Sequence, residues 1–285
     1  MEDSFAHALR DASVGILGLG LMGGSLAMSL NGKCARLIGC DARQSALELA
    51  LSKGIIHHAE NDSAKLPAQV DILILATPVP SIIEFLQQLP LLTSKPLIVM
   101  DIGSTKRDIL QAMSVLPDNF DPIGGHPICG KEKLGLENAD VNLYQSAPFV
   151  ITSLERTTQR AKSAAEQIIF ASGANCFEMT AEEHDRILAA TSHFPFLISS
   201  ALVHSTPQEY ASFVGPGFRS TSRLADTPSH MMMGILKSNR DNVLSAIRLF
   251  QNTLDEIESA LHDENYAKLE VMLNKAQNQY QTFTQ

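Results

Sequence analysis

The chain of 285 residues has few cysteines and a shortage of basic residues, and each shortage excludes a class of protein. Its four cysteines form neither a CxxC pair nor a dense disulfide framework, so we expect a cytoplasmic protein with no metal site. The sequence has 22 Lys and Arg residues against 31 Asp and Glu residues, which gives a net charge of −9. This balance argues against non-specific nucleic-acid binding, which needs a basic surface. An anionic substrate must therefore be met by local arginine or lysine side chains.

The sequence also has no apolar run that is typical of a membrane span. Its most apolar N-terminal stretch, residues 14–30, is rich in glycine, slightly too short to span, and preceded by acidic residues rather than a basic leader. We therefore predict no membrane association and no secretory signal. The hydrophobic content of 45% and the length are sufficient for a globular protein with two domains.

A glycine-rich turn stands between a strand-like run, residues 14–17, and the start of a helical pattern. Gly18, Gly20 and Gly23 have the G-x-G-x-x-G spacing, in which glycines permit a tight turn, close approach of a pyrophosphate, and close packing of helix on strand. The helix N-terminus then offers free N–H groups to phosphate oxygens. Because a strand precedes the glycines and an acidic residue follows them downstream, we predict dinucleotide binding. The predicted cofactor-binding residues are Gly18, Leu19, Gly20, Leu21, Met22, Gly23, Asp41, Arg43, Thr77 and Pro78.

The acidic residue downstream is Asp41, which ends the second strand-like run. A carboxylate at this place accepts hydrogen bonds from the adenosine ribose and repels a 2′-phosphate, which favours NAD over NADP. Arg43 either pairs with a phosphate or lies solvated at the start of the next helix, and the sequence leaves both open.

Strand-like and helical segments alternate up to residue 180. The strand-like segments are residues 14–17, 37–40, 70–76, 96–101, 120–124, 149–152 and 175–179. This alternation predicts right-handed β-α-β units and a doubly wound parallel sheet of the Rossmann type. We also expect a glycine-rich loop at residues 124–127, and a helix N-capped by Ser104.

No convincing strand follows residue 180. We expect a helix over residues 181–204 with a kink at Pro195, a loop at residues 213–218, and further helices. The sequence thus predicts a dinucleotide-binding domain, residues 1–180, and an all-helical domain, residues 181–285.

Apolar residues of the last third recur at heptad spacing. They are Val243, Ile247, Phe250, Leu254, Ile257 and Leu261. Such a stripe packs either inside its own subunit or against a second copy of the chain, and the spacing alone does not choose.

Three polar residues follow predicted strands, where ligands bind in an open parallel sheet: Thr77, Ser104 and His126. Imidazole titrates near neutrality, so His126 is a candidate base that accepts a hydroxyl proton as a hydride departs. Ser104 either orients His126 or only caps a helix.

The helical part contributes further polar candidates. His193 lies in an apolar run and is either a satisfied core residue or part of a cavity. Arg219 and Arg223, one helical turn apart, either bind carboxylates or form a solvated basic face.

Together these segments resemble the prephenate dehydrogenase family, which includes arogenate and cyclohexadienyl dehydrogenases. The resemblance spans nearly the whole chain. Its segments are GLGLMGGSLA from Gly18, DIGSTK at 101–106, GGHPICG at 124–130, KEKLG at 131–135, TSHFP at 191–195 and GPGFRSTSR at 215–223.

The resemblance implies an NAD-dependent oxidative decarboxylation in tyrosine biosynthesis and a homodimer formed through the helical domain. It implies that His126 accepts the ring hydroxyl proton with help from Ser104, and that Arg223 holds the ring carboxylate. His193, Lys131, Glu132 and Arg219 are the further substrate-binding candidates. The chain departs from the family pattern at Phe196, where members often have histidine, and at Ser220, where many have aspartate.

Two other functions remain possible from the sequence. A β-hydroxyacid dehydrogenase shares the expected layout and uses a catalytic lysine in its second domain, for which Lys237 is the candidate. A non-catalytic NAD-binding redox sensor would need the glycine-rich turn but not His126, Ser104 and Arg223 together.

Overall fold

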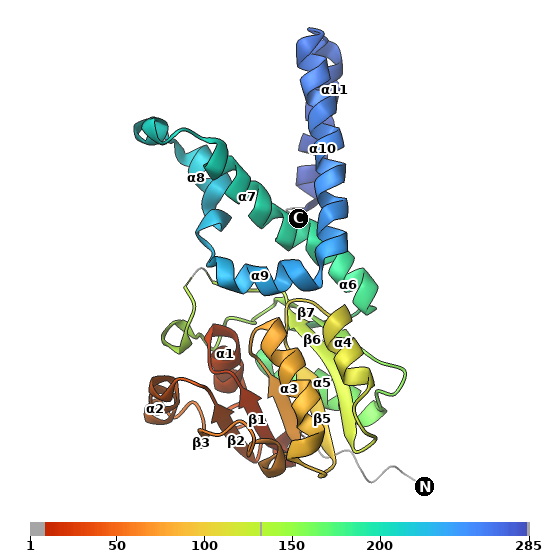
Figure 1. Cartoon of the computed structure of the whole chain (residues 1–285). Helices are drawn as coiled ribbons and strands as arrows, with labels where there is room; N and C mark the ends of the chain where they lie inside the picture. The colour runs from red at the N-terminus through yellow and green to blue at the C-terminus, as the bar shows by residue number, and fades with distance from the viewer. Residues whose placement is uncertain (1–8, 132, 284–285) are drawn as a thin grey trace.

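A single mixed sheet organises the first part of the chain in the computed structural model, which describes residues 9–131 and 133–283 (Figure 1). Within these residues the eight strands are ordered β3-β2-β1-β4-β5-β6-β7-β8. Their bounds are β1 Ser13–Leu17, β2 Arg36–Cys40, β3 His58–Glu60, β4 Ile72–Leu75, β5 Leu97–Asp101, β6 Phe120–Pro127, β7 Pro148–Thr152 and β8 Asn175–Glu178. The order reverses direction between β1 and β4, where a parallel sheet opens a crevice for ligands.

Helices cover both faces of this sheet. They are α1 Leu21–Leu30, α2 Gln44–Ser52, α3 Val79–Leu92, α4 Arg107–Ser114 and α5 Gln159–Ser172. Apolar side chains of α1, α2 and α5 form one core cluster with the sheet, and those of α3 and α4 form the other. The central strands are buried on both faces, as expected for continuous Val, Ile and Leu runs. The predicted doubly wound sheet is confirmed.

The sheet departs from the expected parallel pattern in two places. β7 runs antiparallel to β6, and β3, which the sequence did not predict, is a short polar edge strand paired with β2. Residues 124–127, expected as a loop, instead complete β6 because they pair with β7. A side chain on Gly125 would lie 2.7 Å from the Asp101 carbonyl oxygen, so glycine permits the close approach of β6 to β5.

The start of α4 also differs from expectation. The helix begins at Arg107, not at Ser104, and Lys106 occupies the N-cap position without a side-chain capping bond. Instead, the Asp185 carboxylate accepts hydrogen bonds from the backbone N–H groups of Lys106 and Arg107, at 2.7 and 3.0 Å. The cap therefore comes from the helical part of the chain, which a local sequence pattern does not reveal.

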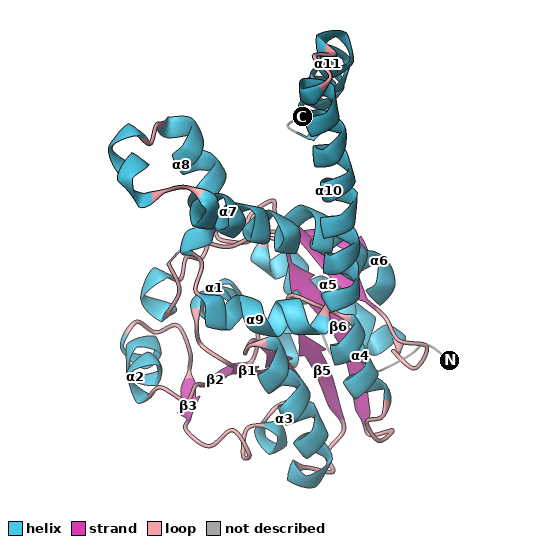
Figure 2. Cartoon of the chain, turned by 45° about the horizontal axis from the view of Figure 1, so that its top comes forward, coloured by secondary structure: helices cyan, strands magenta, loops and turns pink. Residues whose placement is uncertain are grey.

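Helices make up the rest of the chain (Figure 2). They are α6 Ala181–Leu188, a π-helical turn Ala189–His193, α7 Phe194–Ser205, α8 Pro216–Ser222, α9 Ser229–Ser238, α10 Arg240–His262 and α11 Tyr266–Phe283. Pro195 lies at the start of α7, so the expected kink takes the form of a π turn immediately before it. The loop expected at residues 213–218 is shorter, because α8 already begins at Pro216.

Residues 181–205 form the one helical run of the described chain that is long and apolar enough to cross a membrane, with a mean hydropathy of 1.4 over its most apolar window. Yet three of its polar residues, His184, Asp185 and His193, are buried and bonded to polar groups elsewhere in the chain. The run is therefore a junction helix between the two parts of the protein.

The predicted heptad stripe on α10 is largely uncovered within one chain. Val243, nearest the sheet, is buried, but Phe250, Leu254 and Leu261 are 39%, 51% and 51% exposed. α11 packs along α10, and the pair extends away from the sheet (Figure 1). Packing inside its own subunit thus accounts for only part of the stripe.

Candidate active site

A cleft of about 730 Å³ opens where the sheet order reverses, at the carboxyl ends of β1, β2 and β4. Six of the predicted cofactor residues line it: Gly18, Gly20, Asp41, Arg43, Thr77 and Pro78. The other four, Leu19, Leu21, Met22 and Gly23, are not among its lining residues. Leu19 and Leu21 direct their side chains into the core and contribute backbone to the turn.

The turn between β1 and α1 has the backbone that a dinucleotide requires. Gly18 adopts φ +100°, a conformation that favours glycine. A Cβ on Gly23 would lie 1.9 Å from the Gly18 carbonyl oxygen, so only glycine lets α1 pack this closely on the turn. The buried Thr77 hydroxyl, also at the cleft, has no hydrogen-bond partner among the described residues. These features fit a bound dinucleotide.

Asp41 links the cleft to the glycine-rich turn. Its Oδ2 accepts a hydrogen bond from the Leu19 backbone N–H at 2.7 Å. Its Oδ1 accepts from the Arg43 backbone N–H at 2.9 Å and pairs with the Arg43 guanidinium at 3.2 Å. The carboxylate thus lies between the turn and Arg43 at the wall of the cleft.

His126 is the second-last residue of β6, and the residue is 9% exposed. Its Nδ1 is 2.8 Å from Nε2 of His184, a residue of α6. No described residue makes a hydrogen bond to its other ring nitrogen, Nε2. Burial lowers the pKa of His126 well below its usual value, and repulsion from His184, Lys106 and His193 adds to this effect. The ring is therefore neutral at physiological pH and can accept a proton.

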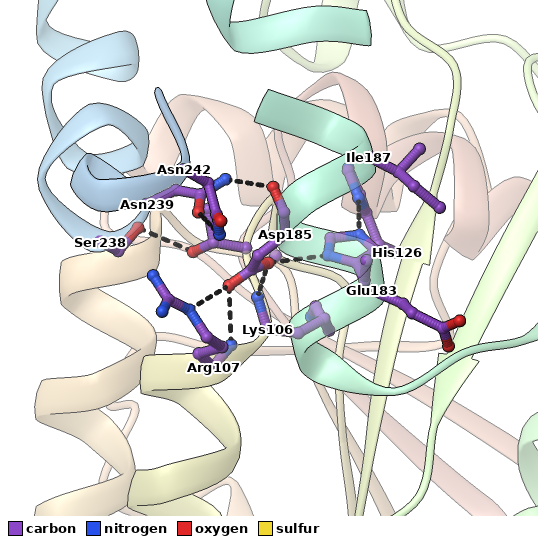
Figure 3. A network of polar contacts seen from close by, with 12 residues as sticks. Lys106, Arg107, His126, Glu183, Asp185, Ile187, Ser238, Asn239 and Asn242 are labelled. Atoms are coloured by element: carbon purple, nitrogen blue, oxygen red, sulfur yellow. Dashed lines mark hydrogen bonds and ion pairs between the residues drawn. The ribbon is translucent and has the colours of Figure 1, made fainter. Parts of the chain in front are cut away.

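Asp185 lies between the start of α4 and the ring of His184, and Figure 3 shows its carboxylate beside Lys106 and Arg107. Its Oδ1 lies 2.8 Å from His184 Nδ1, and the same carboxylate caps α4. Burial by itself would raise the pKa of Asp185. The hydrogen bonds from the His184 ring and from the backbone of Arg107 and Lys106 outweigh burial and hold this pKa below its usual value. Asp185 is thus ionised.

A buried ion pair lies beneath His126. The Lys106 ammonium pairs with the Asp101 carboxylate and donates a hydrogen bond to the Gly125 carbonyl oxygen at 2.6 Å. Asp101 also accepts hydrogen bonds from the backbone of Gly103 and Gly125, at 2.7 and 3.3 Å. The pair ties the end of β5 to the segment that carries His126. Removing either partner would leave an uncompensated buried charge.

His193 lies in the π turn and is buried. Its Nδ1 is 3.1 Å from the Asn239 amide nitrogen, which also donates to the Asp185 carbonyl oxygen at 2.6 Å. Burial lowers the pKa of His193 to about 4, partly opposed by the charge of Asp185. Because the neutral ring accepts at Nδ1 from the amide, its Nε2 carries the hydrogen.

Among the described residues, none of the other predicted site residues makes a hydrogen bond to His126. Arg219 belongs to α8 and Arg223 to the following 3-10 turn. Both elements pack on α7, and α8 lies away from the sheet in Figures 1 and 2. Lys131 pairs with Asp140 at 2.7 Å on the surface. Ser104 is half-buried after β5 and makes no hydrogen bond to His126. Glu132 lies outside the described residues.

His184, Asp185 and Asn239 were missed by the sequence reasoning, although they position both histidines. A local signal existed for α6, because Thr180 and Glu183 form a capping box that places His184 and Asp185 in the first turns of a helix. No local pattern indicates that this helix meets β6. Asn239 precedes α10 and carries no motif.

Comparisons with known proteins agree with this geometry. Residues 26–178 match the family model described as "Prephenate dehydrogenase, nucleotide-binding domain", and residues 180–275 match "Prephenate dehydrogenase, dimerization domain". The chain is 30% identical over 264 residues to the prephenate dehydrogenase of Bacillus subtilis, which covers 89% of this chain and 71% of that protein.

Two crystal structures are similar over nearly the full length. The prephenate dehydrogenase of Aquifex aeolicus, in complex with hydroxyphenyl propionate and NAD+, superposes with a TM-score of 0.88 at 28% identity, over 95% of this chain and 98% of that one. The arogenate dehydrogenase of Synechocystis gives a TM-score of 0.80 at 26% identity, over 95% and 99%. With its turn, its strand-end histidine and both matched domains, the chain belongs to the prephenate dehydrogenase family.

Proposed function

We propose that this protein catalyses the NAD-dependent oxidative decarboxylation of prephenate or arogenate, a step of tyrosine biosynthesis. The observation that carries the proposal is His126, a neutral imidazole at a strand end. It is held at Nδ1, and no described residue bonds its Nε2. Family membership and the NAD+ complex of the Aquifex relative support the same reaction.

The chemistry divides between the cofactor and the chain. NAD, held along the glycine-rich turn and Asp41, supplies the hydride acceptor. As the hydride leaves the carbinol carbon of the ring, the hydroxyl oxygen must lose its proton, and His126 Nε2 takes it as a general base. Loss of carbon dioxide then makes the ring aromatic. Ser104, half-buried after β5, is proposed to contact the same hydroxyl.

Substrate anions require cations, and this acidic chain offers few of them. We assign the ring carboxylate to Arg223, with Arg219, His193, Lys131 and Glu132 as further substrate contacts. α8 and the 3-10 turn that carries Arg223 pack on α7, and the apolar stripe of α10 is largely exposed. We propose that the site is completed in a homodimer, where helical segments of two copies interlock. The family model of this region is described as a dimerization domain, which supports the dimer.

We further propose the domain division at residue 180, between β8 and α6, and a cytoplasmic location. The four cysteines are all free thiols, as a reducing compartment requires. Neither nucleic acid nor membrane is an expected partner of this acidic protein.

The alternative functions have less support. Lys237, the lysine that a β-hydroxyacid dehydrogenase would use, is exposed on α9. A redox sensor would not need the buried Asp185-His184-His126 arrangement at the end of β6.

The test is NADH formation by purified protein supplied with NAD and either prephenate or arogenate, measured side by side. We expect turnover with at least one substrate and loss of turnover in His126→Asn. Absence of NADH with both, while NAD still binds, would refute the proposed activity and favour the sensor.

A further inference from the structure

Three side chains form a hydrogen-bonded line that runs from α6 to His126. His184 Nδ1 lies 2.8 Å from Asp185 Oδ1, and His184 Nε2 lies 2.8 Å from His126 Nδ1. The two imidazole rings meet at 67°, with centroids 5.0 Å apart, so they contact edge-on rather than stacked. Both His184 and Asp185 are fully buried. The line is therefore shielded from water along most of its length.

The direction of each hydrogen bond follows from the ionised end. A carboxylate only accepts hydrogen bonds, so His184 Nδ1 carries a hydrogen. A neutral His184 then has a bare Nε2, which accepts from His126 Nδ1. His126 in turn keeps its hydrogen at Nδ1 and presents the lone pair of Nε2. The opposite arrangement, with a hydrogen on His184 Nε2 directed at a bare His126 Nδ1, would require both ring nitrogens of His184 to carry a hydrogen.

We propose that His184 and Asp185 are positioning residues that fix His126 in the tautomer able to act as a base, and that they share the proton it accepts. When Nε2 takes the hydroxyl proton of the substrate, the Nδ1 proton shifts toward His184 Nε2. The positive charge then lies beside the Asp185 carboxylate, and the total number of protons on the line rises by the one that the substrate lost. This inference rests on the proposed function.

The charged groups around His126 explain why its protonation needs the support of His184 and Asp185. In the described part of the chain, the charged or titratable groups around His126, besides His184 and Asp185, are the Lys106–Asp101 ion pair, Arg107 at the start of α4, and His193 in the π turn. Lys106 and His193 both oppose a charge on His126. An isolated imidazole at this place would be a weak proton acceptor, whereas one linked to a carboxylate through His184 is a better one.

A purely structural role is the competing explanation, because Asp185 also caps α4 and His184 could serve only to hold it. Two substitutions separate these roles. His184→Asn retains an amide near the Nδ1 position, which can bond Asp185 but does not reach His126. His184→Gln retains an amide oxygen near the Nε2 position, which can accept from His126 Nδ1.

We expect His184→Gln to lose about tenfold in kcat and His184→Asn at least about a hundredfold, with the KM values and the NAD affinity within about twofold of wild type. The acid limb of the kcat profile should move to lower pH in His184→Asn, because the carboxylate no longer supports the proton on His126. Ser238→Ala is the matched control: it removes the buried 2.8 Å contact to Thr105 at the same junction and leaves the line intact. Equal losses in the two His184 variants, or a more active Asn variant, would overturn the proposal.

The tautomer itself can be measured without turnover. In ¹⁵N-histidine-labelled wild-type protein with NAD bound, we expect the His126 signals, assigned by their loss in His126→Asn, to show a protonated Nδ1 and a bare Nε2. The reverse pattern would overturn the inference even if the His184 variants fail to fold. A protein with the expected tautomer but no activity on either substrate would refute the proposed function instead.

Discussion

The two halves of the molecule differ in how completely they bury their own apolar residues. Both core clusters consist of residues from the sheet half, where most strand positions are buried. In the helical half few apolar side chains are fully buried, and Leu249, Val271 and Leu273 are 70%, 68% and 57% exposed. Most apolar side chains of the sheet half are buried within one chain, whereas α10 and α11 present apolar surface of the kind that marks an interaction site.

The contact between the two halves places residues of the helical half beside His126. The first turns of α6 lie on the sheet half and supply His184 and Asp185, and α9 packs on α3, while α8 and the α10–α11 pair extend away from it (Figure 1). One part of the helical half therefore serves His126 of its own chain, and the remainder is available to a second copy. This division gives different expectations for substitutions in each place.

The largest expected effect is on assembly. Leu254→Glu places a charge in the middle of the exposed α10 stripe, where two copies are proposed to meet, and burial of an unpaired charge disfavours association. We expect a dimer for the wild type and a monomer of about half that mass for the variant by light scattering, with loss of most activity. Leu91→Glu is the control, because Leu91 is 88% exposed in the sheet half. A wild-type monomer, or equal effects of both changes, would contradict the comparison.

The second-largest effect is expected from removal of the proposed base, His126. His126→Asn keeps polarity but cannot take a proton, so kcat should fall about 10²- to 10⁴-fold while NAD affinity stays nearly unchanged. Because burial lowers the pKa of His126 well below 6.5, the neutral base persists into mildly acidic solution. The wild-type acid limb therefore lies below pH 6.5, lower than an ordinary imidazole would give. Retention of most turnover in the variant would assign the base to another group.

Acid should also destabilise the junction. His193 has a pKa of about 4 in the folded protein against 6.5 when unfolded. Below pH 6.5 the unfolded histidine gains a proton that the folded one excludes, so stability falls as the pH falls from about 6.5 to about 4. The loss of stability approaches about 3.5 kcal/mol at acid pH, because each pKa unit corresponds to about 1.4 kcal/mol. Denaturant unfolding of wild type and His193→Gln across this range measures it, and equal slopes would exclude His193 as the cause.

The sequence predicted the sheet half well because its signals are local. Apolar runs bounded by turns marked most strands, and the glycine spacing marked the cofactor turn. β3 was not predicted because it is short and polar. Only its pairing with β2 makes it a strand. The segment around His126 was assigned to a loop because its two glycines indicate a turn, whereas pairing with β7 makes it a strand.

The polar arrangement of the site could not be predicted in the same way. His126 was recognised, but its partner His184 lies 58 positions away, and the two meet only because α6 returns to the end of β6. The same is true of Asp185 as the cap of α4. Such contacts depend on tertiary packing, which no local spacing encodes.

A smaller effect is expected from the arginine proposed to hold the substrate. Arg223→Ala removes a charge-assisted hydrogen bond to the ring carboxylate, worth about 1.5–3 kcal/mol, so KM should rise about tenfold or more with little change in NAD affinity. If the second copy supplies Arg223, mixing Arg223→Ala with inactive His126→Asn should restore some activity in mixed dimers. Failure to restore any activity would place Arg223 in the same site as the His126 of its own chain.

The smallest effect concerns cofactor choice, which belongs entirely to the sheet half. Asp41→Ser removes the carboxylate that would bond the ribose hydroxyls and repel a 2′-phosphate, and leaves Arg43 without its ion-pair partner. The freed guanidinium can then meet a phosphate, so the ratio of kcat/KM for NAD over NADP should fall several-fold. Asp41 also accepts the Leu19 backbone N–H, so a modest loss with NAD itself is expected from a looser glycine turn. Arg43→Ala is the matched comparison and should lower use of NADP without this loss. A wild-type enzyme that uses NADP as well as NAD would show that the Asp41 carboxylate, although at the wall of the cleft, does not control the choice.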